Sequence, residues 1–156
     1  MAPQAPSAIR ANAKTFNSKG LVDVSEPKAL EIDEIKSLVK QYAQATLNAQ
    51  KAGFDMIEVH AANGYLIDQF LRDKTNHRDD QYGGSIENRA RFLLEIMDEI
   101  IKVYPANLIG CRISPASTFN DIEDSNPQNL YSYVVSELGK RKIAYLHIIE
   151  IGRAHV

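Results

Sequence analysis

The chain has 156 residues, of which 44% are hydrophobic and 24% charged, a composition typical of a globular domain and unlike that of a disordered or membrane protein. Its 18 basic and 20 acidic residues give a net charge of −2, which does not favour binding to nucleic acid or anionic lipid. No apolar run has the length of a membrane span or a signal peptide. The single cysteine, Cys111, cannot form an intrachain disulfide, and the His and Cys residues are not spaced as metal ligands are. We therefore expect one domain in a reducing, cytoplasmic compartment.

The first predicted elements are a helix and a strand. Apolar residues recur at intervals of three and four over 35–49, which predicts an amphipathic helix that ends at Gly53. Residues 56–60 then form a β-type run, bounded on its far side by the turn dipeptide Asn-Gly at 63–64. This strand leads into a long loop, which we expect to continue to about Gly84.

Two more helix and strand pairs follow. Ser85 is placed to cap a second helix, and an apolar strand follows it at 108–113. Asn126 is placed to cap a third helix that ends at Gly139, and residues 143–149 form a third apolar strand. The alternation predicts an α/β fold with a parallel sheet and right-handed crossovers. The strands read as apolar throughout, so we expect both faces of the sheet to be apolar.

The loop after the first strand holds the candidate site residues. In parallel α/β folds the chemistry lies beyond the carboxyl ends of the strands, where His60, Asn63 and Tyr65 occur within six positions. All three side chains can donate hydrogen bonds, so His60 and Asn63 could bind one oxygen while Tyr65 supplies a proton. Structural roles stay open at this point, because a lone His or Tyr is often structural and Asn-Gly is a common turn.

A much longer pattern surrounds these residues. Residues 58–71 read EVHAANGYLIDQFL, and together with 76–92 they resemble the signature block of the old yellow enzyme family of FMN-dependent ene-reductases. The resemblance begins at 6–9 and continues through 109–115 and 144–150, so it covers nearly the whole chain. Unlike a short glycine motif, a match of this length is not expected by chance.

The resemblance implies both a fold and a reaction. The family is a TIM (β/α)8 barrel that binds FMN, takes electrons from NAD(P)H and reduces the C=C bond of α,β-unsaturated ketones or aldehydes. It implies that His60 and Asn63 hold the carbonyl oxygen of a small-molecule enone, that Tyr65 protonates the α-carbon, and that Arg112 contacts the flavin. From the net charge and the lack of a long apolar run we expect no nucleic-acid or membrane partner, and the oligomeric state stays unknown.

Three βα units are too few to close such a barrel. By their place in the family pattern they match its fourth, fifth and sixth strands, so we expect residues 1–150 to be part of a barrel. Such a part lacks the phosphate site for FMN, and we expect it to be inactive alone. Residues 151–156 do not continue the family pattern and are expected to be a non-native tail. Two alternatives remain: a related flavoprotein of the dienoyl-CoA reductase or amine dehydrogenase type, or an inactive truncated fragment.

Overall fold

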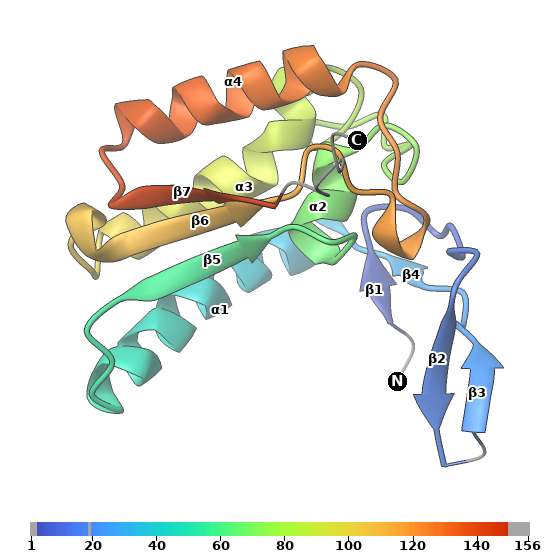
Figure 1. Ribbon diagram of the computed structural model, residues 1–156, viewed down its shortest axis with the longest axis horizontal. Helices are drawn as coiled ribbons and strands as arrows, with labels where there is room; N and C mark the ends of the chain where they lie inside the picture. The colour runs from blue at the N-terminus through green and yellow to red at the C-terminus, as the bar shows by residue number, and fades with distance from the viewer. Residues whose placement is uncertain (1–2, 19, 150–156) are drawn as a thin grey trace, which may run out of the picture.

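The centre of the computed structural model, which describes residues 3–18 and 20–149, is a three-stranded parallel sheet (Figure 1). Its strands are β5 (Ile57–Ala61), β6 (Ile109–Ile113) and β7 (Tyr145–Ile148), in the spatial order β5-β6-β7. The middle strand, β6, pairs in parallel with both neighbours, and helices connect each strand to the next. The predicted α/β alternation and parallel sheet are therefore confirmed.

Three helices cover one face of this sheet, namely α1 (Ile32–Lys51), α3 (Ile86–Ile101) and α4 (Pro127–Lys140). Figure 1 shows α1 and α3 behind β5 and β6, and α4 along β7. The predicted caps are confirmed, because the side chains of Ser85 and Asn126 accept a backbone N–H of the first turn at 3.3 and 3.2 Å. Within the described residues no helix is long and apolar enough to cross a membrane.

The hydrophobic core lies between the sheet and these helices. Val59, Cys111 and Ile113 of the sheet are at most 5% exposed and pack in this core. The helices contribute buried residues at three- and four-residue spacing: Ile35, Val39, Leu93, Ile96, Leu130 and Val134. Burial of each such side chain contributes about 1.5–3 kcal/mol. Burial also raises the pKa of the Cys111 thiol to about 12, as expected of a small core residue rather than a nucleophile.

The opposite face of the sheet is polar, and no helix of the described chain covers it (Figure 1). The register places His60 opposite Arg112 and Arg112 opposite His147, so these side chains share that face. Glu58 lies on the same face, with a carboxyl oxygen 3.0 Å from Nδ1 of His147. The expectation of two apolar faces is therefore wrong. Successive residues of a strand point to opposite faces, and the overall apolar character of each strand concealed its polar alternate positions.

The loop after β5 contains a short helix, α2 (Leu66–Leu71), which the sequence did not lead us to expect. Its residues Ile67, Phe70 and Leu71 are at most 1% exposed and belong to the core. A helix of 6 residues is too short for a helical repeat to be recognised in the sequence. It packs against α3, and so brings the chain back from the end of β5 toward the helical layer.

The N-terminal region forms two small sheets that the sequence pattern did not predict. β1 (Gln4–Ala5) pairs in parallel with β4 (Lys28–Ala29), and β2 (Lys14–Asn17) pairs antiparallel with β3 (Gly20–Asp23). Strands of 2 and 4 residues are too short to show a reliable alternation. The guanidinium of Arg78 donates to two backbone carbonyls of this region at 2.8 and 2.6 Å. These contacts fix the chain next to β1 and β4, and both small sheets lie beyond the carboxyl end of β5 (Figure 1).

Candidate active site

The chain turns sharply after β5, at Asn63 and Gly64. Both residues adopt the left-handed backbone conformation, with φ of 58° and 71°, which asparagine and glycine reach at the lowest cost. A Cβ atom on Gly64 would also lie 2.6 Å from the carbonyl oxygen of Phe119, so no larger residue fits there. The turn therefore requires glycine at position 64 and favours asparagine at position 63, and it determines where the Asn63 side chain begins.

His60, Tyr65 and Arg112 come together next to this turn. His60 is exposed on the polar face of the sheet, directly opposite Arg112 on β6. Tyr65 immediately precedes α2, and its ring centroid lies 5.5 Å from that of His60. The Tyr65 side chain is prominent at the surface, 54% exposed, so a ligand over the polar face can reach the phenol.

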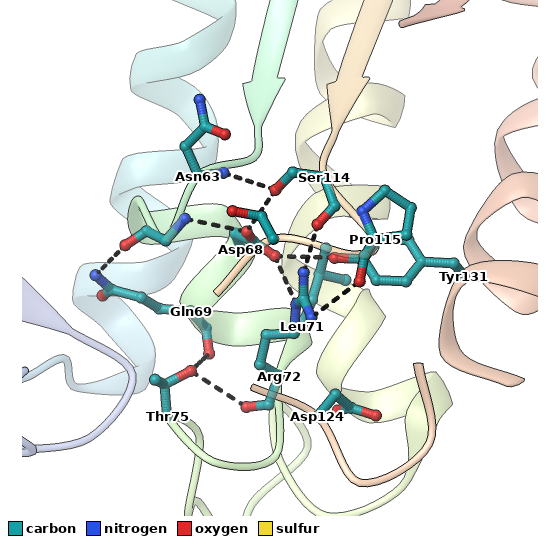
Figure 2. Close-up of polar contacts among 12 residues, drawn as sticks. Asn63, Asp68, Gln69, Leu71, Arg72, Thr75, Ser114, Pro115, Asp124 and Tyr131 are labelled. Atoms are coloured by element: carbon teal, nitrogen blue, oxygen red, sulfur yellow. Dashed lines mark hydrogen bonds and ion pairs between the residues drawn. The ribbon is translucent and has the colours of Figure 1, made fainter. Parts of the chain in front are cut away.

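Asn63, the fourth predicted site residue, is held through its backbone. Its N–H donates to the hydroxyl of Ser114 and its carbonyl accepts from the side chain of Asn120. Figure 2 shows the Asn63 carboxamide pointing away from these buried groups. The hydrogen bonds found for Asn63 in the described chain thus use its main chain and leave the carboxamide available to a ligand.

Arg112 shows an unmet hydrogen-bonding requirement. Its Nε is buried and has no hydrogen-bond partner among the described residues. A buried guanidinium N–H without an acceptor is costly, so a ligand that brings an acceptor or a negative charge would stabilise this arrangement. A flavin ring would fit this requirement, since its pyrimidine portion carries acceptors and becomes negatively charged on reduction.

Beneath the turn lies a buried polar cluster that the sequence did not reveal (Figure 2). Oδ1 of the fully buried Asp68 accepts hydrogen bonds from Nε of Arg72 and from the hydroxyl of Tyr131, both at 3.0 Å. Oδ2 accepts from the N–H of Gly64 at 3.1 Å and from the hydroxyl of Ser114 at 3.2 Å. In the sequence, only the i,i+4 spacing of Asp68 and Arg72 could have indicated this cluster, and such spacing is typical of ion pairs on the surface of a helix.

An open pocket of about 460 Å³ adjoins the site. Tyr65 and Asn120 line one side of it, and Lys14 and Thr15 of β2 line another. Tyr65 therefore lies between the polar face of the sheet and a pocket that the N-terminal strands help to form. Among the described side chains, no group of His, Cys, Asp and Glu is arranged to hold a metal ion.

Sequence comparison places the chain in a known family. The family model described as NADH:flavin oxidoreductase / NADH oxidase matches residues 1–155. A Leishmania infantum protein named "probable flavin mononucleotide-dependent alkene reductase" is 52% identical over 123 residues, which are 79% of this chain and 34% of that protein. The 12-oxophytodienoate reductase 2 of Arabidopsis thaliana is 45% identical over 124 residues, which are 80% of this chain and 33% of that protein.

Solved structures agree with the sequence match. Morphinone reductase superposes with a TM-score of 0.93 at 42% identity, over 100% of this chain and 43% of its own. The old yellow enzyme homologue from Zymomonas mobilis superposes with a TM-score of 0.92 at 39% identity, over 95% of this chain and 42% of its own. The chain thus spans less than half the length of these relatives. It belongs to the NADH:flavin oxidoreductase / NADH oxidase family, which is the family of the old yellow enzymes.

Proposed function

We propose that the enzyme containing this chain uses FMN and NAD(P)H to reduce the C=C bond of α,β-unsaturated carbonyl compounds. The observation that supports the proposal most is the contact of His60 and Tyr65 next to the Asn63 turn, with Arg112 opposite His60 and its Nε without a hydrogen-bond partner among the described residues. The names of the relatives support it, because one is named a probable flavin mononucleotide-dependent alkene reductase and another, morphinone reductase, was solved in complex with tetrahydroNAD. No observation favours a dienoyl-CoA reductase or an amine dehydrogenase instead.

The donors at the end of β5 suit a developing oxyanion. FMN, when bound, would supply the hydride that reaches the β-carbon of the enone. Negative charge then accumulates on the carbonyl oxygen, where the His60 ring and the Asn63 carboxamide would each donate a hydrogen bond. Loss of one such preorganised donor typically costs about 2.7–4 kcal/mol of transition-state stabilisation.

Tyr65 and Arg112 complete the proposed division of roles. The hydroxyl of Tyr65 is a hydrogen-bond donor, and Tyr65 would protonate the α-carbon of the substrate. Its ring lies beside His60, so the proton donor and the oxygen-binding groups would contact neighbouring atoms of one ligand. Arg112 would hold the flavin through the N–H that has no partner in the described chain, and its fixed charge would favour an anionic ring.

We further propose that the three βα units belong to a (β/α)8 barrel, with β5, β6 and β7 as its fourth to sixth strands. The helix-free polar face would line the barrel interior, where a polar site is expected at the carboxyl ends of the strands. Residues 1–150 would be the barrel part. The proposed tail, 151–156, lies outside the described residues. A reducing compartment such as the cytoplasm suits the buried free thiol of Cys111.

Substitution of Asn63 tests the proposed site. In the complete FMN-loaded enzyme, Asn63→Ala should weaken binding of both a phenol and an enone about tenfold, because each places an oxygen at the same donor. Affinity is measured by titration of the flavin absorbance. Asn48→Ala, an exposed position on α1, is the matched control and should leave both affinities unchanged. Unchanged phenol affinity in Asn63→Ala would remove Asn63 from the substrate site.

A second test concerns the chain on its own. Within the described residues β5 and β7 each pair on one side only, so the sheet ends in two open strand edges that favour aggregation. We expect the isolated 156-residue chain neither to fold stably as a monomer nor to retain FMN. The measurements are visible absorbance after addition of FMN, elution volume and thermal unfolding. A yellow monomer with a cooperative transition would show that these three units form an independent domain.

A further inference from the structure

Buried side chains bind both N–H groups of the Asn63–Gly64 turn. The N–H of Asn63 donates to the Ser114 hydroxyl at 2.8 Å, and the N–H of Gly64 donates to Oδ2 of Asp68 at 3.1 Å. Ser114 and Asp68 are fully buried, so neither acceptor is exchanged for water at the surface. The two acceptors are themselves joined, since the Ser114 hydroxyl donates to Oδ2 of Asp68 at 3.2 Å.

Side chains also bind both carbonyl groups of the turn. The side-chain amide of Asn120 donates to the carbonyl of Asn63 at 2.9 Å, and that of Gln69 donates to the carbonyl of Gly64 at 2.7 Å. All four polar backbone groups of the turn are thus held by side chains. Since both residues have left-handed backbone, which an isolated chain rarely adopts for Asn, these bonds stabilise a conformation of higher energy.

The Ser114 hydroxyl donates one hydrogen bond and accepts another, each with a defined partner. Its hydroxyl proton is used in the bond to Asp68, so an oxygen lone pair is left for the N–H of Asn63. Asp68 is in turn fixed by Arg72 and by the Tyr131 hydroxyl. Burial, together with the neighbouring Asp68 carboxylate, raises the pKa of Tyr131 above its usual value, so the phenol keeps its proton and donates it.

We propose that Ser114, oriented by Asp68, is a positioning residue that sets the direction of the Asn63 carboxamide toward the substrate oxygen. The inference rests on the proposed role of Asn63 in binding that oxygen. Ser114 lies directly after β6, whereas Asn63 follows β5, so the bond fixes the substrate donor relative to the neighbouring strand. Arg112, two residues before Ser114, is on that same strand. The donor to the substrate and the proposed contact to the flavin therefore share one rigid support.

The expected consequence is specific to ligand binding. Functional groups must be held within about 0.5 Å of the productive geometry by the residues that support them. With Ser114→Ala the N–H of Asn63 loses its acceptor, and the left-handed turn can relax. The carboxamide then occupies the productive orientation only part of the time, which lowers the affinity for a substrate oxygen.

The test is a double-mutant cycle in the complete FMN-loaded enzyme, with phenol as the probe and the flavin absorbance as the signal. We expect Ser114→Ala to weaken phenol binding about fivefold and Asn63→Ala about tenfold. The double variant should bind no more weakly than Asn63→Ala alone, because Ser114 acts through a side chain that is then absent. Hydrogen exchange of the Asn63 amide should also become faster in Ser114→Ala.

The matched control is Thr46→Ala. Thr46 is a buried hydroxyl on α1, 4% exposed, that donates to the carbonyl of Tyr42 and does not contact the site. Thr46→Ala should lower thermal stability without changing phenol affinity. Unchanged phenol affinity in Ser114→Ala would overturn the inference while the role of Asn63 stands. The same holds if Ser114→Ala weakens phenol binding fivefold both in the native enzyme and in the Asn63→Ala variant. Unchanged affinity in Asn63→Ala would overturn that role itself.

Discussion

Tyr65→Phe is expected to slow enone reduction by about 100-fold or more, because a positioned general acid typically contributes a factor of 10² to 10⁴. The substitution removes only the phenolic oxygen and its proton. The ring, whose centroid lies 5.5 Å from that of His60, stays in place. Reduction of the flavin by NAD(P)H does not need this proton and should change less than about twofold. Stopped-flow measurement of the two half-reactions separates the effects.

Tyr133→Phe is the matched control for this experiment. Tyr133 is a partly buried tyrosine on α4, and it packs against the core on the helical side of the sheet. Its substitution should leave both half-reactions unchanged, since nothing on that side contacts the proposed ligand. Equal losses in the two half-reactions of Tyr65→Phe would assign Tyr65 a structural role and would leave the source of the proton open.

Local patterns predicted the main elements of this fold. The caps at Ser85 and Asn126 are properties of three or four consecutive residues, and both occur where the sequence placed them. The apolar strands likewise follow from composition over a few residues. The proposed site residues His60, Asn63 and Tyr65 came from their closeness in the chain and from the family resemblance, and the structure places them around one turn.

The features that the sequence did not predict depend on contacts between distant residues. Ser114 is 51 residues from Asn63, and Tyr131 is 63 residues from Asp68, so neither bond has a local signature. The polar face of the sheet became visible only once the register placed His60 and Arg112 opposite each other. The face of the sheet on which a side chain lies is set by the pairing between strands. The sequence of a single strand of five residues does not determine that face.

Asp68→Ala is expected to destabilise the complete enzyme by about 3–5 kcal/mol, because it leaves the buried guanidinium of Arg72 without its charge partner. Arg72 is 2% exposed, so water cannot replace the lost carboxylate. The remaining acceptors of Arg72 are backbone carbonyls, of which Ser114 provides the closer, at 2.7 Å. The substitution also removes the acceptor for the N–H of Gly64 in the turn. Chemical denaturation measures the free energy of unfolding.

Asp98→Ala is the matched control, because it removes the same residue type from a second Asp–Arg pair. Asp98 accepts two hydrogen bonds from Arg141, at 2.7 and 2.8 Å, but its side chain is 53% exposed. Water and salt screen an exposed pair, so its loss should cost less than about 1 kcal/mol. The two aspartates differ in burial and also in hydrogen bonding, since Asp68 accepts from Tyr131, Gly64 and Ser114 as well as from Arg72. If Asp68→Ala were no more destabilising than Asp98→Ala, the Asp68 carboxylate would not be an essential charge partner of the buried Arg72 guanidinium.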